Sequence, residues 1–165
     1  MNVLVTYGSK HGSTREIADA IGDEIRSDGH AAVVRSADAV LDLEGYDAVV
    51  LGGALYMGRW HSDARRFARR YAGELRTMPV WLFSSGPLDR SADEKEIPAV
   101  GFVAKLAAEV GARGHATFGG CLAPDASGLI AGAIAKKSAG DYRDWDGIRG
   151  WAREIATALE LRATA

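Results

Sequence analysis

The sequence predicts an α/β domain in which five parallel strands, in the order 2-1-3-4-5, form a doubly wound sheet with helices on both faces. Five short apolar runs alternate with stretches of helical spacing, and this alternation requires right-handed crossovers and a mainly parallel sheet. A run that is apolar throughout, such as residues 47–53, is typical of a strand covered on both faces. The length of 165 residues suits one domain, 1–165.

The first half of the chain predicts three strands and two helices. The first strand begins at residue 2 or 3, and after its loop apolar residues recur at helical spacing until Asp28 and Gly29 end the helix. We expect the second strand at 31–34 and the third at 47–53, with residues 37–46 forming either a short helix or an extended crossover. An apolar stripe then predicts a helix over 64–75.

The second half continues the alternation. Residues 79–84 predict the fourth strand, and Pro98 is expected to open the next helix, because proline favours the first helical position. The fifth strand is expected at 115–119, and the last helix after Asp144 or Asp146. Between them, we expect residues 123–142 to add a further segment to the same domain.

The loop after the first strand has the composition of a phosphate site. A helix start leaves backbone N–H groups without partners and carries the positive end of the helix dipole, so it attracts anions. The loop contains no nucleoside triphosphate or dinucleotide motif, which leaves the single phosphate of a mononucleotide. The alternative is an ordinary turn from a strand into a helix, because hydroxyl residues are also favoured as helix caps. The candidate residues are Ser9, Lys10, His11, Gly12, Ser13 and Thr14.

Three further loops should meet this one, because ligands of doubly wound sheets lie at the carboxyl ends of the strands where the winding reverses. Glycine in these loops lets backbone groups reach the polar edge of a flat heterocycle, and an aromatic residue or methionine can cover its face. For Tyr56, Met57 and Trp60 the alternative is packing at the sheet edge or on the following helix. The candidate residues are Ala54, Leu55, Tyr56, Met57 and Gly58, then Ser84, Ser85, Gly86, Pro87 and Leu88, then Gly119, Gly120 and Cys121.

Composition excludes several classes of function. The formal net charge of −2 gives no electrostatic case for nucleic acid. The single cysteine forms no internal disulfide or metal cluster, and no apolar run approaches the ~20 residues of a membrane span. With a strand at the start of the chain there is no room for a signal peptide, so we expect a cytoplasmic protein. A phosphorelay receiver would need acids where residues 6–8 and 52–53 stand. We assign no catalytic residue and no metal ligand.

The chain resembles the flavodoxin-like superfamily, and within it the menaquinone-dependent protoporphyrinogen oxidases and related flavodoxin-domain proteins. The matching residues are Thr14-Arg15-Glu16-Ile17-Ala18, Gly52, Gly58, His61-Ser62, Phe67, Trp145 and Trp151-Ala152-Arg153-Glu154-Ile155-Ala156. The resemblance implies that residues 9–14 bind the phosphate of FMN and that the loops at 54–58, 84–88 and 119–121 hold its isoalloxazine ring. It also implies an oxidoreductase that passes electrons between a substrate, protoporphyrinogen-like or other, and a quinone.

Two departures leave the substrate open. His11 stands where flavodoxins usually have threonine and the oxidases an acid, and residues 123–142 are less basic and less aromatic than the insertion of the oxidases. A flavodoxin electron carrier and a deazaflavin-binding reductase therefore remain alternatives. The arginines at 65–70 could contact a redox partner protein or an anionic membrane surface, although a solvated helix face is the ordinary interpretation. The apolar run 128–137 could contact a membrane surface, although a packed helix is the ordinary interpretation.

Overall fold

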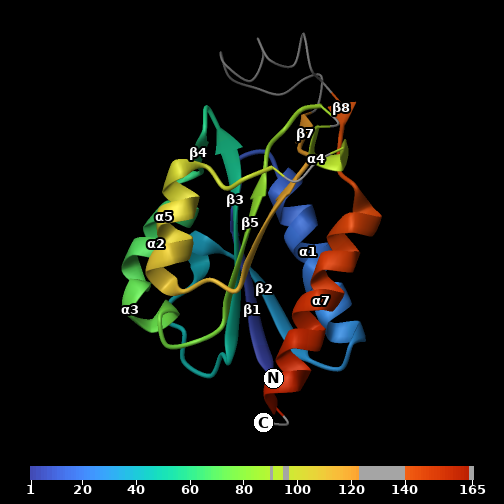
Figure 1. The fold of residues 1–165 in the computed structure, drawn as a ribbon. Helices are drawn as coiled ribbons and strands as arrows, with labels where there is room; N and C mark the ends of the chain where they lie inside the picture. Colours follow the sequence, from blue (N-terminus) through green and yellow to red (C-terminus); the bar gives the residue numbers. More distant parts are fainter. Residues whose placement is uncertain (90, 95–96, 123–139, 164–165) are drawn as a thin grey trace.

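The computed structural model describes residues 1–89, 91–94, 97–122 and 140–163. Its centre is a sheet of five parallel strands in the order β2-β1-β3-β5-β6 (Figure 1). The strands are β1 (Asn2–Gly8), β2 (Ala31–Ser36), β3 (Ala48–Tyr56), β5 (Val80–Ser85) and β6 (Gly114–Phe118). The predicted strand order is confirmed, because the short antiparallel strand β4 (Arg59–Trp60) only shifts the numbering.

Helices cover both faces of the sheet (Figure 1). On one face lie α1 (Ser13–Ser27) and α7 (Trp145–Ala163), and on the other α2 (Ser62–Arg70), α3 (Ala72–Leu75) and α5 (Gly101–Val110). The remaining elements are η1 (Ala37–Ala39), α4 (Ser91–Glu94), β7 (Cys121–Leu122) and β8 (Gly140–Asp141), of which the last two pair with each other. The last helix begins at Trp145, directly after Asp144, as the sequence predicts. The Asp144 carboxylate accepts a hydrogen bond from the Gly147 N–H at 3.1 Å and so caps the helix start.

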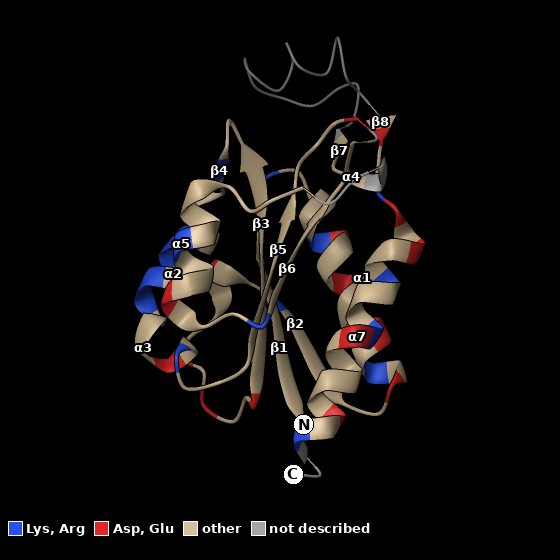
Figure 2. Ribbon diagram, viewed as in Figure 1, with Lys and Arg blue, Asp and Glu red and all other residues tan. Residues whose placement is uncertain are grey.

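The pleat of the strands divides the apolar side chains between two cores. In β1, Val3 and Val5 pack with the α1 and α7 side, whereas Leu4 packs with α2 and α5 on the other side. Successive side chains of a strand point to opposite faces, so a strand between two helical layers has to be apolar at every position. Charged residues lie mostly on the helices and loops around the sheet (Figure 2).

The third strand is longer than predicted. We expected it to end at Gly53, but β3 continues to Tyr56, turns at Met57 and Gly58 and pairs back through β4. A Cβ atom on Gly52 would lie 2.0 Å from the ring of Phe83, so the glycine makes room for an aromatic side chain inside the strand. The glycine signal at 52–53 therefore reflects close packing and not the end of the strand.

Smaller differences have local causes. The predicted helix over 64–75 is divided into α2 and α3 at Tyr71, although its apolar stripe is buried as expected. Pro98 does not open a helix, because α5 begins at Gly101. The preceding segment is held to β6 by a hydrogen bond from the Thr117 hydroxyl to the Ile97 carbonyl (3.2 Å). The fifth strand ends at Phe118, which leaves Gly119 in the loop.

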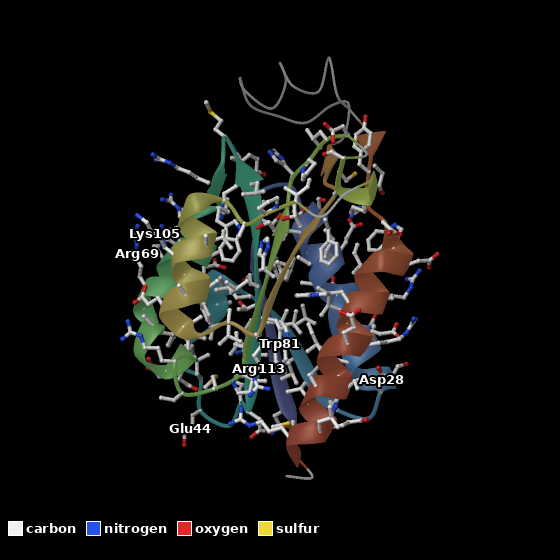
Figure 3. The ribbon with its side chains drawn as sticks, in the orientation of Figure 1. Asp28, Glu44, Arg69, Trp81, Lys105 and Arg113 are labelled. Atoms are coloured by element: carbon white, nitrogen blue, oxygen red, sulfur yellow. The ribbon has the colours of Figure 1, made fainter. Side chains whose placement is uncertain are left out.

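The additional segment predicted at 123–142, with its apolar run 128–137, lies outside the described residues except for 140–142. Among the helices that the structure describes, none has the length and apolar character needed to cross a membrane. Figure 3 labels Arg69 and Lys105 on the outer side of α2 and α5. It also labels Trp81, whose ring centroid lies 5.8 Å from the guanidinium carbon of Arg113.

Candidate functional site

The loops at the carboxyl ends of β1, β3, β5 and β6 surround a cavity of about 490 Å³. The sequence predicts a ligand at this end of the sheet, next to β1 and β3, where the winding direction of the chain reverses. The lining residues come from all four predicted loops and from one position outside them, His61. They are Ser9, Lys10, His11, Ser13, Thr14, Ala54, Leu55, Tyr56, Met57, His61, Ser85, Gly86, Leu88, Gly120 and Cys121.

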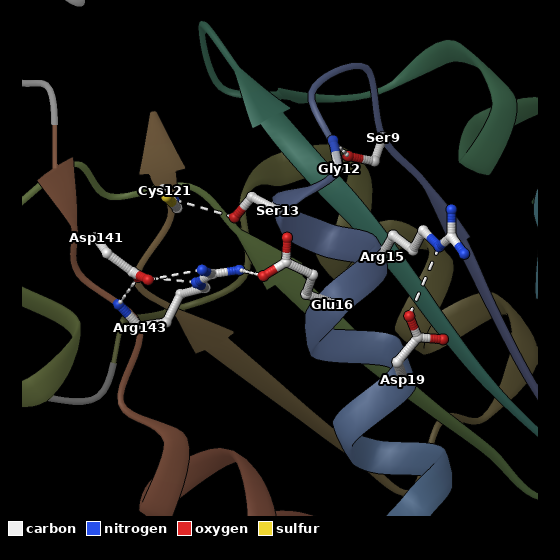
Figure 4. A network of polar contacts seen from close by, with 9 residues as sticks. All are labelled: Ser9, Gly12, Ser13, Arg15, Glu16, Asp19, Cys121, Asp141 and Arg143. Carbon is white, nitrogen blue, oxygen red and sulfur yellow. Dashed lines mark hydrogen bonds and ion pairs between the residues drawn. The ribbon is translucent and has the colours of Figure 1, made fainter. Parts of the chain in front are cut away.

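The loop from β1 to α1 presents the start of a 15-residue helix to this cavity. Gly12 precedes the helix with φ 84°, a left-handed conformation that glycine adopts without strain, and its N–H donates to the Ser9 hydroxyl at 3.2 Å. Because Gly12 is the N-cap residue, the helix start has no side-chain cap hydrogen bond from that position. The Ser13 hydroxyl accepts a hydrogen bond from the Cys121 N–H at 3.0 Å, which joins this loop to the one after β6 (Figure 4).

Thr14 supplies the clearest sign of a ligand. Its side chain is fully buried and lines the cavity, yet its hydroxyl has no hydrogen-bond partner among the described residues. A buried polar group without a partner costs roughly 1–3 kcal/mol. The Thr6 hydroxyl is also buried without a partner, but it lies within β1 and does not line the cavity. An oxygen-rich anion at the start of α1 would satisfy the Thr14 hydroxyl together with the first N–H groups of the helix.

The opposite wall is aromatic and apolar. The ring centroid of Tyr56 lies 6.3 Å from that of His11 and 6.4 Å from that of His61. Burial raises the pKa of the Tyr56 phenol, and a hydrogen bond with the Lys10 backbone opposes that shift. Met57 is 87% exposed at the tip of the hairpin, with φ 49°, a conformation that methionine rarely adopts. A flat ring placed against this wall would cover side chains that are otherwise in water.

Trp60 does not belong to this wall. The sequence placed it with Tyr56 and Met57 in the loop after the third strand. Trp60 is 1% exposed, however, and its indole Nε1–H donates to the Ser84 hydroxyl at 2.8 Å. A Cβ atom on Gly53 would lie 2.4 Å from the Trp60 ring, so the missing side chain makes the inward position possible. The ring therefore supports β3 and β5 from the side of α5, where Phe102 lies 6.2 Å away, centroid to centroid.

Five predicted residues are not among those that line the cavity: Gly12, Gly58, Ser84, Pro87 and Gly119. Ser84, Pro87 and Gly119 have structural roles. Ser84 accepts the hydrogen bond from Trp60, and the Pro87 carbonyl accepts one from the Gly120 N–H at 2.8 Å. A Cβ atom on Gly119 would lie 1.8 Å from the Tyr142 carbonyl oxygen, so only glycine fits there.

His61 lines the cavity and also precedes α2. Its Nδ1 accepts a hydrogen bond from the Asp63 N–H at 3.4 Å. The sequence signal was its place after the Tyr56–Gly58 loop, but the β3–β4 hairpin is what brings it to the cavity.

A charged cluster, which the sequence did not predict, lies beside the start of α1. The Arg143 side chain is 7% exposed and contacts the carboxylates of Glu16 (2.7 Å) and Asp141 (2.6 Å), as Figure 4 shows. Arg143 lies 127 positions from Glu16, so no local pattern connects them. The carboxylate contacts raise the pKa of Arg143, and the hydrogen bond from Arg143 lowers the pKa of Asp141.

Burial raises the pKa of the Cys121 thiol, which favours a packed cysteine over a reactive thiolate. Among the described residues, no group of three or more histidine, cysteine or acidic side chains is placed to hold a metal ion.

Known proteins resemble this chain over most of its length. The profile of the family described as "Flavodoxin domain" matches residues 4–138. A protoporphyrinogen IX dehydrogenase [quinone] of Escherichia coli K12 is 26% identical over 94% of this chain and 95% of its own length. Among solved structures, an archaeal flavodoxin (TM-score 0.65, 17% identical) covers 97% of this chain and 99% of its own. The rubredoxin oxygen:oxidoreductase of Desulfovibrio gigas (TM-score 0.70, 15% identical) covers 99% of this chain, which spans 37% of that protein.

Proposed function

This chain belongs to the flavodoxin-domain family, and we propose that it is an FMN-dependent oxidoreductase that passes electrons between a reduced substrate and a quinone. The flavin supplies the redox chemistry when it is bound, while the protein binds it, orients it and controls access to it. The proposal therefore depends on how well the cavity suits FMN and on what lies beside it.

The buried, unpartnered hydroxyl of Thr14 is the observation that carries the proposal. It lies in the first turn of α1, where the N–H groups and the helix dipole favour a negative charge. The hydroxyl of Ser13 accepts from Cys121, so its own proton remains to be donated to an anion. A phosphate bound here would accept from Thr14, Ser13 and the start of the helix.

The rest of the cavity suits a flat heterocycle. The side chains of Tyr56 and Met57 form one wall, and the loops with Ser85, Gly86 and Gly120 line the same cavity. We propose that the isoalloxazine ring lies between them, with its phosphate at Thr14. His61 lines the same cavity and is our candidate for holding a proton next to the second substrate.

The identity of the electron acceptor, a quinone, is the more specific part of the proposal. Its support is the sequence similarity to the Escherichia coli dehydrogenase, whose name specifies protoporphyrinogen IX and a quinone, over nearly the whole of both chains. We propose a quinone such as menaquinone as the acceptor for this chain. As the donor we propose a reduced substrate, either protoporphyrinogen-like or of another kind.

Two measurements test the proposal. First, the purified protein should be yellow, or should quench the fluorescence of added FMN, and a colourless protein that ignores FMN at high micromolar concentration would refute it. Second, the FMN-loaded protein is reduced with dithionite under argon and mixed with a menaquinone analogue, with free reduced FMN as the control. Reoxidation faster than the control supports a quinone-linked enzyme. FMN binding without faster reoxidation supports the electron carrier instead, and tighter binding of 5-deaza-FMN than of FMN supports a deazaflavin.

A further inference from the structure

The cluster around Arg143 joins three segments at the edge of the cavity. The guanidinium donates to Asp141 through Nε (2.8 Å) and Nη2 (2.6 Å) and to Glu16 through Nη1 (2.7 Å). Its carbon lies 4.6 Å from the ring centroid of Trp145. An arginine in this position uses its fork geometry for one carboxylate and a third N–H for the other, which lysine cannot reproduce.

Glu16 brings a negative charge to the helix start at which we propose that the phosphate binds. It lies in the first turn of α1, and a carboxylate there interacts favourably with the positive end of the helix dipole. The same positive end faces the cavity through Ser13 and Thr14. Without a compensating charge, the Glu16 carboxylate would repel a phosphate bound next to it.

Asp141 brings a second negative charge to the same end of the cavity. It is paired with Cys121 between the antiparallel strands β8 and β7, and the Cys121 N–H donates to the Ser13 hydroxyl at 3.0 Å. Figure 4 shows Asp141 and Glu16 on opposite sides of the Arg143 guanidinium. The two carboxylates therefore flank the Arg143 guanidinium, next to the loop that would bind the phosphate.

Cys121 lines the cavity, and its thiol lies near enough to the cluster for these charges to influence the thiol pKa. After burial, the Asp141 charge is the next largest influence that raises the pKa of the thiol, and the Glu16 charge raises it as well. Arg143 lowers it. A negative group in the cavity is thus disfavoured by both carboxylates and favoured by the guanidinium.

We propose that Arg143 is a positioning residue that holds and neutralises Glu16 and Asp141, and thereby allows a dianionic phosphate to bind at the start of α1. The inference rests on the proposed function, in which that phosphate belongs to FMN. Arg143 does not touch the phosphate in this scheme. It acts through the two carboxylates, and it makes the site select a phosphorylated flavin over an unphosphorylated one.

The charge effect is measured first without any flavin. Cys121 is the only cysteine of the chain, so the pH dependence of its alkylation by iodoacetamide gives the pKa of one defined thiol. Arg143→Met should raise this pKa and Glu16→Gln should lower it, and both together should bring it back toward the wild-type value. Arg153→Gln is the matched control. It breaks the 2.6 Å contact between α7 and Glu24, about 12 Å further along α1, and should leave the thiol pKa unchanged.

The second measurement compares the dissociation constants of FMN and riboflavin at low ionic strength. Arg143→Met should weaken FMN about tenfold or more and riboflavin by less than about twofold, with the difference shrinking as salt screens the charges. Glu16→Gln should restore FMN binding in that background. Glu16→Gln alone keeps the Arg143–Asp141 contact, so it tests the charge effect even if Arg143→Met folds poorly, and it should tighten FMN.

The outcomes separate this inference from the function on which it rests. A wild-type protein that binds FMN no more tightly than riboflavin overturns the phosphate site, and with it the role of Arg143. If the wild type prefers FMN, equal losses of FMN and riboflavin in Arg143→Met overturn the inference alone, because they indicate a purely structural role. An unchanged thiol pKa in Glu16→Gln overturns it as well.

Discussion

The replacement Thr14→Val tests the phosphate site, because valine keeps the shape of threonine and removes only the hydroxyl. In the flavin-free protein that hydroxyl is buried and has no partner among the described residues. Its removal should leave the protein as stable as before or make it more stable, by up to roughly 1–3 kcal/mol. Most buried polar side chains behave in the opposite way, since their removal breaks a hydrogen bond.

The effect on FMN should have the opposite sign. A hydrogen bond to a charged group contributes about 1.5–3 kcal/mol. Loss of the bond from Thr14 to the phosphate should therefore weaken FMN roughly 10- to 150-fold, at about 1.4 kcal/mol for each factor of ten. Riboflavin has no phosphate, so its affinity should hardly change.

The assay is a titration of FMN and riboflavin by flavin fluorescence quenching, together with thermal unfolding in the presence and absence of FMN. Thr6→Val is the matched control. Its hydroxyl is also fully buried and unpartnered, but it lies within β1 away from the cavity lining. It should reproduce the gain in stability and leave both flavin affinities unchanged.

Two results would refute the reasoning. If Thr14→Val weakens FMN and riboflavin equally, the side chain supports the shape of the cavity and does not bind a phosphate. If the flavin-free variant is clearly less stable than the wild type, the hydroxyl has a partner in the folded protein and does not await a ligand.

Two further predictions concern the hairpin and the charged cluster. Met57→Asn should stabilise the flavin-free protein by about 0.5–1 kcal/mol, because asparagine tolerates the positive φ of a two-residue hairpin turn. The same change should weaken the binding of FMN and riboflavin alike, because one wall of the cavity is lost. Unfolding and flavin titrations on the same samples check both effects, and unchanged flavin binding would exclude Met57 from the site. Asp141 has its pKa lowered from 3.8 in the folded protein, chiefly by the hydrogen bond from Arg143. Its contribution to stability is therefore complete above about pH 4 and is lost as the pH falls through the lower, folded pKa. Urea unfolding from pH 6 to pH 2.5 should show a smaller acid-induced loss for Asp141→Asn than for the wild type, and equal losses would contradict the assignment.

Local patterns along the chain determined the fold class, the strand order and the position of the cavity. Apolar runs and helical stripes depend on residues a few positions apart, and they predicted the elements around β1, α1 and β5 with small errors at their ends. The position of the cavity followed from topology, because parallel strands bring all their carboxyl ends to the same edge. The loop at 9–14 was recognisable because a helix start needs hydroxyl residues and glycine within a few positions of one another.

Tertiary structure alone decided which side chains face the cavity and which charges act on it. Trp60 turns inward because Gly53 leaves space for its ring and the Ser84 hydroxyl accepts a hydrogen bond from its indole N–H. The β3–β4 hairpin then brings His61 to the cavity. Arg143 reaches Glu16 across 127 positions, and the missing partner of Thr14 is visible only when its surroundings are in place. These features depend on contacts through space between distant segments, for which neither propensity nor spacing along the chain carries a signal.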